Sequence, residues 1–165
     1  YYGSVFKIPE PYILKNGVRV RSLQDPAKKM SKSDENQNGF ISLRDDPDTI
    51  LHKFKRAVTD SEAQVCYREG KDGVNNLMEI YAAVTGLSYA QIEAQFEGKG
   101  YGDFKAAVGE AVIEELRPIQ ARFAELMKDK GQLEVLMKQG AERAIRVSFR
   151  TLEKAKKKMG LILLK

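Results

Sequence analysis

The sequence predicts a mainly α-helical protein, a helical bundle that follows the edge of a sheet. Apolar residues recur at spacings of three and four over most of the chain after residue 46, the period of amphipathic helices. Residues that start and stop helices bound these stretches. The region before residue 24 instead carries short apolar runs with two prolines, and one stretch there has the period of two that is typical of strands.

Residues 1–23 are expected to be extended. Residues 18–21 alternate valine with arginine, and residues 15–17 before them are a turn signal. Because an isolated hairpin is only marginally stable, we expect these strands to join a sheet whose other strands lie outside this sequence. The chain starts at Tyr1 without a methionine, so we expect it to be the later part of a longer protein.

Helix signals begin at Asp46 and Pro47, because aspartate is a good N-cap and proline suits the first helical turn. Residues 63–67 fit either a short strand or an extended link. A helix over about residues 74–85 follows, and Gly86 is its predicted stop.

Ser88 starts the next predicted helix, and Gln91 three residues later completes a capping box. The longest periodic stretch covers residues 104–127 and contains Pro118. Proline removes one helical hydrogen bond, so this stretch is predicted to be either a kinked helix or two helices. A last helix is expected over residues 132–159.

Composition excludes several classes of function. The net charge is +5 and 31% of the residues are charged, and no apolar run has the length of a membrane span. A single cysteine, Cys66, cannot form an internal disulfide, which favours a reducing, cytoplasmic location. His52 is the only histidine, so the sequence predicts no metal site.

The sequence Lys29-Met30-Ser31-Lys32-Ser33 is the strongest functional signal. It lies between clusters of Asp, Asn, Pro and Gly without apolar periodicity, which predicts a loop. Lysine supplies a point charge on a flexible stem, and serine hydroxyls and backbone N–H groups supply neutral donors. This combination suits a polyphosphate. The spacing of the two lysines alone would also fit a solvated run of charges.

The last predicted helix concentrates the positive charge. Residues 138–165 hold nine lysines and arginines against two glutamates, whereas the rest of the chain is slightly negative. One face is basic, and the nearly opposite face is expected to pack. The basic face is a candidate nucleic-acid surface, although a solvated helix face would carry the same pattern. The residues expected on the packed face are Ala141, Ile145, Ser148, Leu152, Ala155 and Met159.

The loop sequence and its flanks resemble class I aminoacyl-tRNA synthetases, and within them the bacterial tryptophanyl-tRNA synthetases. The loop is similar to the second signature motif of that class. Five flanking stretches carry the resemblance further: residues 8–12, 19–26, 55–61, 73–77 and 96–102. The resemblance covers nearly the whole chain.

The resemblance implies ATP as a substrate, with Mg²⁺ accompanying it. Lys29 and Lys32 would be the catalytic residues, binding the ATP phosphates and stabilising the leaving pyrophosphate. The other residues implied in ATP binding are Val20, Met30, Ser31 and Ser33. The first signature of the class, of His-x-Gly-His type, is absent from this sequence, and His52 is not in such a setting.

The resemblance also implies an organisation. Residues 1–43 would end a Rossmann-like α/β catalytic domain, including the last strand or strands and the lysine loop. Residues 44–165 would form a helical domain of the anticodon-binding type. The implied partners are tryptophan, tRNA(Trp) and a second copy in a homodimer, with no membrane. The candidate tRNA-binding residues are Arg143, Arg146, Arg150 and Lys154.

Three alternatives remain at this level, and one of them is a scaffold for protein contacts, for which the sequence offers only amphipathic helices. Tyrosyl-tRNA synthetases share the loop, but they usually carry a further RNA-binding module after their helices. A non-enzymatic, basic helical RNA-binding module would explain the last helix without any dependence on ATP.

Overall fold

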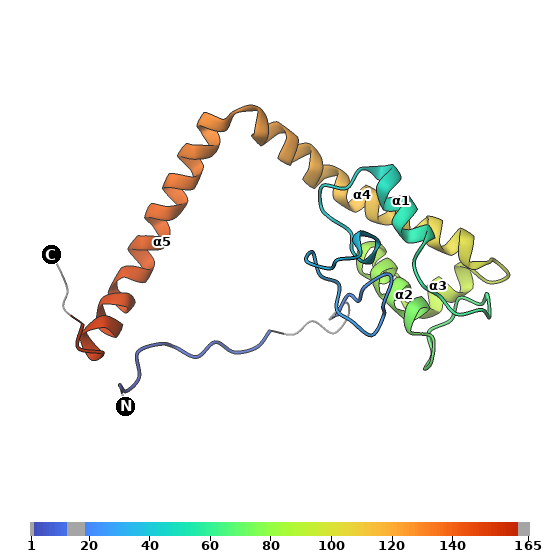
Figure 1. The fold of residues 1–165 in the computed structure, drawn as a ribbon, viewed down its shortest axis with the longest axis horizontal. Coiled ribbons are helices and arrows are strands. Elements are labelled where there is room, and N and C mark those ends of the chain that lie inside the picture. Colours follow the sequence, from blue (N-terminus) through green and yellow to red (C-terminus); the bar gives the residue numbers. More distant parts are fainter. Residues whose placement is uncertain (1, 13–18, 162–165) are drawn as a thin grey trace. The chain divides into compact units, whose positions relative to one another are not determined.

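The computed structural model describes residues 2–12 and 19–161, and these are mainly α-helical, which confirms the predicted class (Figure 1). Within the described residues there is no strand, and one isolated antiparallel bridge joins Arg21 to Lys29. The elements in order are η1 (Gln37–Gly39), α1 (Pro47–Lys55), α2 (Asp72–Thr85), α3 (Tyr89–Gln95), α4 (Tyr101–Lys128) and α5 (Lys130–Lys158).

Helix ends follow local chemistry closely. Asp46 caps α1 by accepting a hydrogen bond from Thr49 N–H at 2.9 Å. The capping box predicted at the start of α3 is formed in both directions between Ser88 and Gln91. Gly86 ends α2 with φ of +74°, a left-handed conformation that glycine adopts without steric cost.

Pro118 lies inside α4, which runs as one helix from Tyr101 to Lys128. The interpretation as two separate helices is therefore wrong. Proline removes one N–H from the ladder of hydrogen bonds but does not forbid helical dihedral angles around it. Helix α5 likewise continues past Gly140, and its start is capped by Asp129, which accepts from Gln132 N–H at 2.9 Å.

Two compact units make up the chain: residues 13–121 form one, and residues 1–12 with 122–165 form the other. The first unit holds the hydrophobic core, where α1, α2, α3 and the first part of α4 bury their apolar faces. Phe96 and Phe104 meet edge to face with ring centroids 4.9 Å apart. The most completely buried side chains of the core are Ile50, Phe54, Val74, Leu77, Met78, Ile92, Phe104 and Val108.

A buried lysine fastens the start of α2 to the start of α4. Lys71 is 3% exposed, and its ammonium donates to Tyr101 Oη at 2.8 Å and to Asp60 Oδ1 at 3.1 Å. Glu62 Oε2 lies 3.0 Å from it. Burial lowers the pKa of Lys71, but these partners raise it more, so the net shift is upward. The ammonium is therefore fully charged in a nearly dry position.

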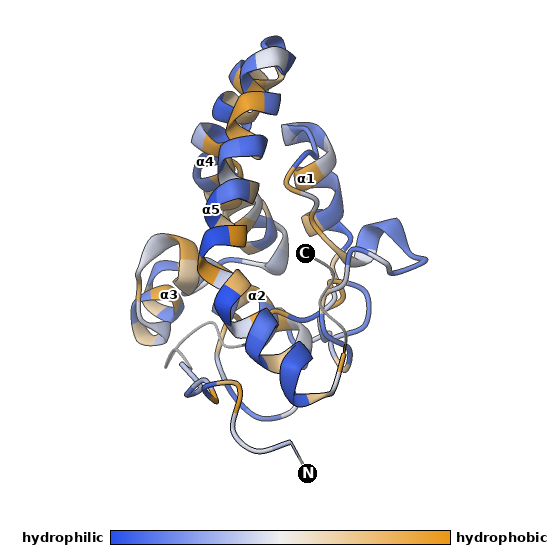
Figure 2. Cartoon of the chain, turned by 90° about the vertical axis from the view of Figure 1, so that its left-hand side faces the viewer, coloured by the Kyte–Doolittle hydropathy of each residue, from blue (hydrophilic) through white to orange (hydrophobic). Residues whose placement is uncertain are grey.

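The unit with α5 departs from expectation. Ile145, Leu152 and Met159 of the predicted packed face are exposed, and Ala155 is the buried residue of that helix. Ala155 is the one residue of that face whose predicted burial is confirmed. Ala141 and Ser148 are exposed as well, so the predicted packing is wrong along most of this face within the described residues. Figure 2 shows hydrophobic and hydrophilic residues mixed along α5. At its end, Lys158 Nζ donates to Ser4 O at 3.3 Å.

The predicted strands before residue 24 are not seen as a ladder in the described residues. Residues 2–12 are extended, and the predicted turn at residues 15–17 lies outside the described residues. Residues 63–67 form a link without strand pairing, so the interpretation as a strand is wrong. Ala63 in this link has a left-handed φ of +56°. A strand needs partners along its edge, and within the described part of the chain the pairing is limited to the bridge at Arg21 and Lys29.

Candidate functional site

The lysine loop, residues 29–33, begins at a short antiparallel pairing of two backbone segments, which we call the loop base. Arg21 and Lys29 lie opposite each other in the antiparallel bridge. Ser22 N–H donates to Lys28 O at 2.9 Å, and Met30 N–H donates to Val20 O at 3.1 Å. The backbone of Lys29 therefore has a defined position, although residues 31–33 beyond it are exposed.

A tight turn closes this base. Lys28 N–H donates to Asp25 O at 2.9 Å, and the Lys28 ammonium lies 3.0 Å from Asp25 Oδ2. The hydrogen bond from Lys28 lowers the pKa of Asp25 below its ordinary value. The backbone N–H and the ammonium of Lys28 therefore both stabilise the turn. Within residues 2–12 and 19–161, no ion pair involves Lys29 or Lys32, and both side chains are exposed.

The tip of the loop is shaped by its serines. Ser31 Oγ and Ser33 Oγ are 2.9 Å apart, and Ser33 N–H donates to Ser31 Oγ at 3.3 Å. Asp34 N–H donates to Ser31 O at 3.1 Å. The serines and lysines are exposed, whereas Met30 is half-buried and packs against the core. Met30 therefore anchors the loop while two cations and two hydroxyls face solvent, an arrangement that can bind phosphate groups.

The backbone of Val20 contacts the lysine loop. Its carbonyl accepts the hydrogen bond from Met30 N–H, while its side chain packs against the core beside that of Met30. The structure therefore connects the predicted positions Val20 and Met30 through one backbone hydrogen bond, with both side chains against the core, and leaves the side chains of residues 29 and 31–33 exposed.

Residues far along the chain hold the base of the loop. Leu23 N–H donates to Gly39 O at 2.9 Å, and Val58 N–H donates to Leu23 O at 2.8 Å. Asn76, on α2, hydrogen-bonds both backbone groups of Arg21. The sequence did carry a signal for Asn76, because it lies four residues before the core residue Ile80 and so shares its helix face.

Close packing at Gly39 completes this base. A Cβ there would lie 2.8 Å from Asp34 Oδ2 and 2.9 Å from Ser22 Oγ. Both distances are shorter than carbon and oxygen atoms tolerate, so a side chain at this position would displace the side chains of Asp34 and Ser22. Sequence reasoning missed Gly39 and Ser22, since neither belongs to a recognisable local pattern.

The candidate tRNA-binding residues share one stretch of α5. Their spacings of three and four place them along one side of the helix. On α4, by contrast, Arg117 pairs with Glu114 and Arg122 pairs with Glu125. No such pair neutralises the α5 side chains within the described residues. These exposed residues are Arg143, Arg146, Arg150 and Lys154.

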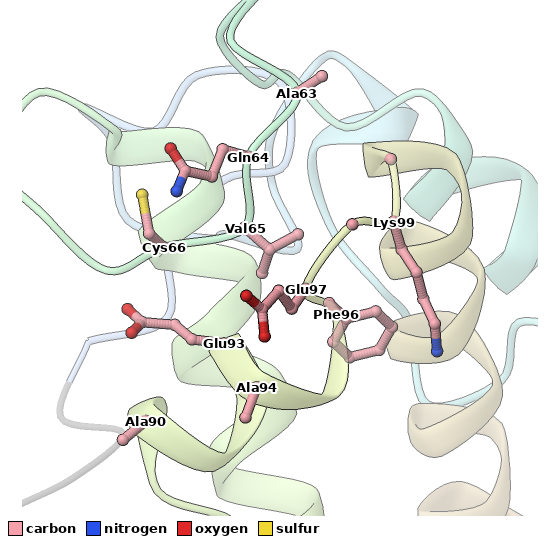
Figure 3. Close-up of a pocket in the computed structure, with 12 residues that line it drawn as sticks. Ala63, Gln64, Val65, Cys66, Ala90, Glu93, Ala94, Phe96, Glu97 and Lys99 are labelled. Carbon is pink, nitrogen blue, oxygen red and sulfur yellow. The ribbon is translucent and has the colours of Figure 1, made fainter.

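A pocket away from the lysine loop is lined by the carboxylates of Glu93 and Glu97 and by the single ammonium of Lys99. It has a volume of about 640 Å³ and lies between residues 63–66 and the segment from α3 to Gly100. Figure 3 shows the carboxylates of Glu93 and Glu97 facing the link that contains Val65. Two carboxylates on one side repel a polyphosphate, so we do not assign the nucleotide to this pocket.

Other classes of site receive no support from the described residues. Among them, no cluster of three or more His, Cys, Asp or Glu side chains could ligate a metal ion. None of the described helices combines the length and the apolar character that crossing a membrane requires.

Comparison with known proteins identifies the family. The model of the tRNA synthetases class I (W and Y) matches residues 1–117. The chain belongs to this family. The matched region contains the whole lysine loop and its supports at Val58 and on α2.

Individual members of the family are similar over nearly the full chain. The tryptophan–tRNA ligase of Wolinella succinogenes is 52% identical over 161 residues, covering 98% of this chain and 49% of that protein. The ligase of Oceanobacillus iheyensis is 49% identical, covering 97% and 49%. The crystal structure of tryptophanyl-tRNA synthetase from Mycoplasma pneumoniae aligns with a TM-score of 0.78 at 31% identity, covering 90% and 45%. The chain thus spans about half the length of these relatives.

Proposed function

We propose that this chain is the C-terminal portion of a tryptophan–tRNA ligase, which activates tryptophan with ATP and transfers it to tRNA(Trp). The observation that carries the proposal is the exposed pair Lys29 and Lys32 on a loop whose base is hydrogen-bonded to the helical core. Identities near 50% to tryptophan–tRNA ligases support tryptophan over tyrosine.

In the proposed reaction, a carboxylate oxygen of tryptophan attacks the α-phosphorus of ATP. A bond forms between that oxygen and phosphorus, the bond to the bridging oxygen breaks, and its electron pair leaves with pyrophosphate. Lys29 and Lys32 would stabilise the negative charge that develops on the leaving group. A hydroxyl of the terminal ribose of tRNA then attacks the acyl carbon, and AMP leaves.

Magnesium enters the proposal only as a companion of ATP. The described residues offer no cluster of three metal-ligating side chains, so they do not fit a protein-held Mg²⁺ site. We therefore assign no step to the ion. The cations of the loop are the groups of this chain that we expect to meet the phosphates.

The ATP reading is tested by pyrophosphate exchange. Because the chain spans about half of its relatives, we suggest a hybrid ligase in which residues 1–165 follow the first half of the Wolinella succinogenes enzyme. Exchange is measured with each of the twenty amino acids. We expect exchange with tryptophan, and a loss of about 100-fold in K29A and in K32A.

Lys28 supplies the matched control, since it is an exposed lysine of the same segment that pairs with Asp25. K28A should keep exchange within about threefold of the unsubstituted hybrid. Exchange driven by tyrosine would favour the tyrosyl alternative. Full exchange in both K29A and K32A would refute the role of the loop.

The proposal includes the basic residues of α5 as a tRNA surface. Four unpaired cations along one helix would release counterions from the phosphate backbone when they bind. Charge reversal in R146E/R150E should weaken tRNA(Trp) binding and reduce its salt dependence. K128E, at the end of α4, should weaken tRNA(Trp) binding less. Unchanged binding would remove α5 from the interface. RNA binding that persists without any ATP-dependent reaction in the hybrid would favour the non-enzymatic module.

The proposed organisation follows the resemblance. Residues 1–43 would end the catalytic domain and residues 44–165 would form the domain that receives the anticodon. The enzyme would act as a homodimer in the cytoplasm. Light scattering of the hybrid ligase checks the dimer, since a monomeric mass would contradict it.

A further inference from the structure

A single asparagine connects α2 to the base of the lysine loop. Asn76 is 2% exposed. Its Oδ1 accepts from Arg21 N–H at 2.8 Å, and its Nδ2 donates to Arg21 O at 2.9 Å. One side-chain amide therefore satisfies both backbone groups of one residue that is 55 positions away in the sequence. Figure 1 shows α2 beside this part of the chain.

The hydrogen-bond pattern of the bridge explains why the backbone N–H and C=O of Arg21 are available to Asn76. The bonds of the bridge come from the neighbours, Ser22 to Lys28 and Met30 to Val20. In such a non-hydrogen-bonded antiparallel pair, the N–H and C=O of the central residue point away from the opposite strand. Lys29 thus lies on one side of Arg21, and Asn76 occupies the side where a further strand would pair.

The side chain of Arg21 strengthens the same connection. Its Nη1 donates to Pro26 O at 3.3 Å, within the turn that leads to the loop. The same atom lies 3.5 Å from Asp72 Oδ1 in the first turn of α2. Exposure makes this ion pair weak, so the buried amide of Asn76 is the main constraint.

We propose that Asn76 is a positioning residue for the lysine loop, acting through Arg21. Through the bridge, the amide sets where the backbone of Lys29 lies, and so where the loop presents its cations to the phosphates. The inference rests on the proposed function, since it requires that the loop acts on ATP. It adds that α2, which is distant in sequence from the lysine loop, controls the geometry of the phosphate-binding residues.

The neighbouring residue supplies a matched control. Asn75 makes the same kind of two-bond contact with a different backbone: its Nδ2 donates to Arg68 O at 2.7 Å, and Arg68 N–H donates to its Oδ1 at 3.2 Å. Arg68 lies in the link before α2 and has no contact with the loop base among the described residues. Substituting Asn75 therefore removes an amide that makes the same two bonds in a more exposed position, without touching the loop.

The experiment compares N76D with N75D in the hybrid ligase. Aspartate keeps the shape and the acceptor but replaces the donor with a buried carboxylate oxygen, which faces the carbonyl oxygen of Arg21 and leaves it without its partner. We expect N76D to lower kcat/KM for ATP in pyrophosphate exchange by about tenfold, with the KM for tryptophan unchanged. N75D should change neither value by more than about twofold.

Hydrogen exchange supplies a readout that is independent of catalysis. The amides of Arg21 and Met30 should exchange faster in N76D and at the original rate in N75D, because only the first loosens the bridge. Equal effects of both variants on ATP kinetics would reduce Asn76 to a general stabilising residue and overturn the proposal. Faster exchange at Arg21 without a change in kcat/KM for ATP would also overturn it.

The two proposals can fail separately. If K29A and K32A keep full activity, the loop does not serve ATP and the proposed function is wrong. If those variants lose activity while N76D keeps it, the positioning role alone is wrong.

Discussion

Replacing Gly73 by alanine tests how α2 approaches the segment that holds the loop base. A Cβ at Gly73 would lie 2.1 Å from the carbonyl oxygen of Val58 and 3.3 Å from Thr59 Cα. Both are backbone atoms, so no side chain can rotate away. The two segments would have to separate by about 1 Å to restore ordinary contact.

The size of the effect follows from that overlap. Overpacking in a core costs roughly 1–3 kcal/mol, and backbone on both sides places this case near the upper end. Alanine recovers about 1 kcal/mol of helix propensity relative to glycine. We therefore expect G73A to lose about 2 kcal/mol of the free energy of unfolding, which lowers Tm by roughly 4–8 °C for a chain of this size. Thermal unfolding followed by circular dichroism measures it.

Gly140 on α5 is the matched control, because it also lies inside a helix but a Cβ there meets no atom within 4 Å. G140A should therefore stabilise the chain by about 0.5–1 kcal/mol. A G73A variant with an unchanged or higher Tm would refute the close approach of α2 to Val58. Since Val58 N–H bonds to Leu23 O in the loop base, G73A should also slow pyrophosphate exchange in the hybrid ligase.

Three further predictions follow from other contacts. K71M removes a buried ammonium from its carboxylate and hydroxyl partners, and we expect a loss of about 3 kcal/mol in urea unfolding. Burial raises the pKa of Asp60, but its hydrogen bonds lower it to a net value below 3.8. The stabilisation from the Asp60 carboxylate is present above pH 3.8 and is lost as the pH falls through the folded pKa. The free energies of unfolding of wild type and D60N should therefore converge in acid. The hydrogen bond to Glu79 raises the pKa of Tyr67 to about 12, so in E79Q the tyrosinate absorbance of Tyr67, taken as the difference from Y67F, should appear at lower pH.

Each of these three predictions would be contradicted by a specific result. A loss below about 1 kcal/mol in K71M would mean that the ammonium is solvated like a surface lysine. Parallel acid titrations of wild type and D60N would remove the carboxylate from the pH dependence. An unchanged tyrosinate titration in E79Q would show that Glu79 does not hold the Tyr67 hydroxyl.

Local signals in the sequence predicted the parts of the fold that depend on neighbours in the chain. The N-cap at Asp46, the capping box at Ser88 and the stop at Gly86 each involve atoms within four residues. The lysine loop was visible for the same reason, since its chemistry lies in five consecutive residues. The sequence did not decide between one kinked helix and two helices at Pro118, because both have the same local pattern.

Long-range contacts were not predictable in the same way. Asn76 reaches Arg21 across 55 positions, and Lys71 reaches Tyr101 across 30. Nothing in a single sequence identifies the partner of a buried polar group, although its place on an apolar helix face marks it as unusual. The exposed face of α5 was mispredicted because amphipathic spacing indicates which side can pack and does not supply the surface that covers it.

The amide of Asn76 also has a consequence for the behaviour of the chain in concentrated solution. A short antiparallel ribbon normally leaves N–H and C=O groups along its outer edge, and such an edge can recruit a strand from another molecule and begin aggregation. Here the outward groups of Arg21 are already occupied by a side chain that belongs to a helix and cannot extend the sheet. The same contact that orders the ribbon therefore closes it to intermolecular pairing, which a β-strand in that place would not have done.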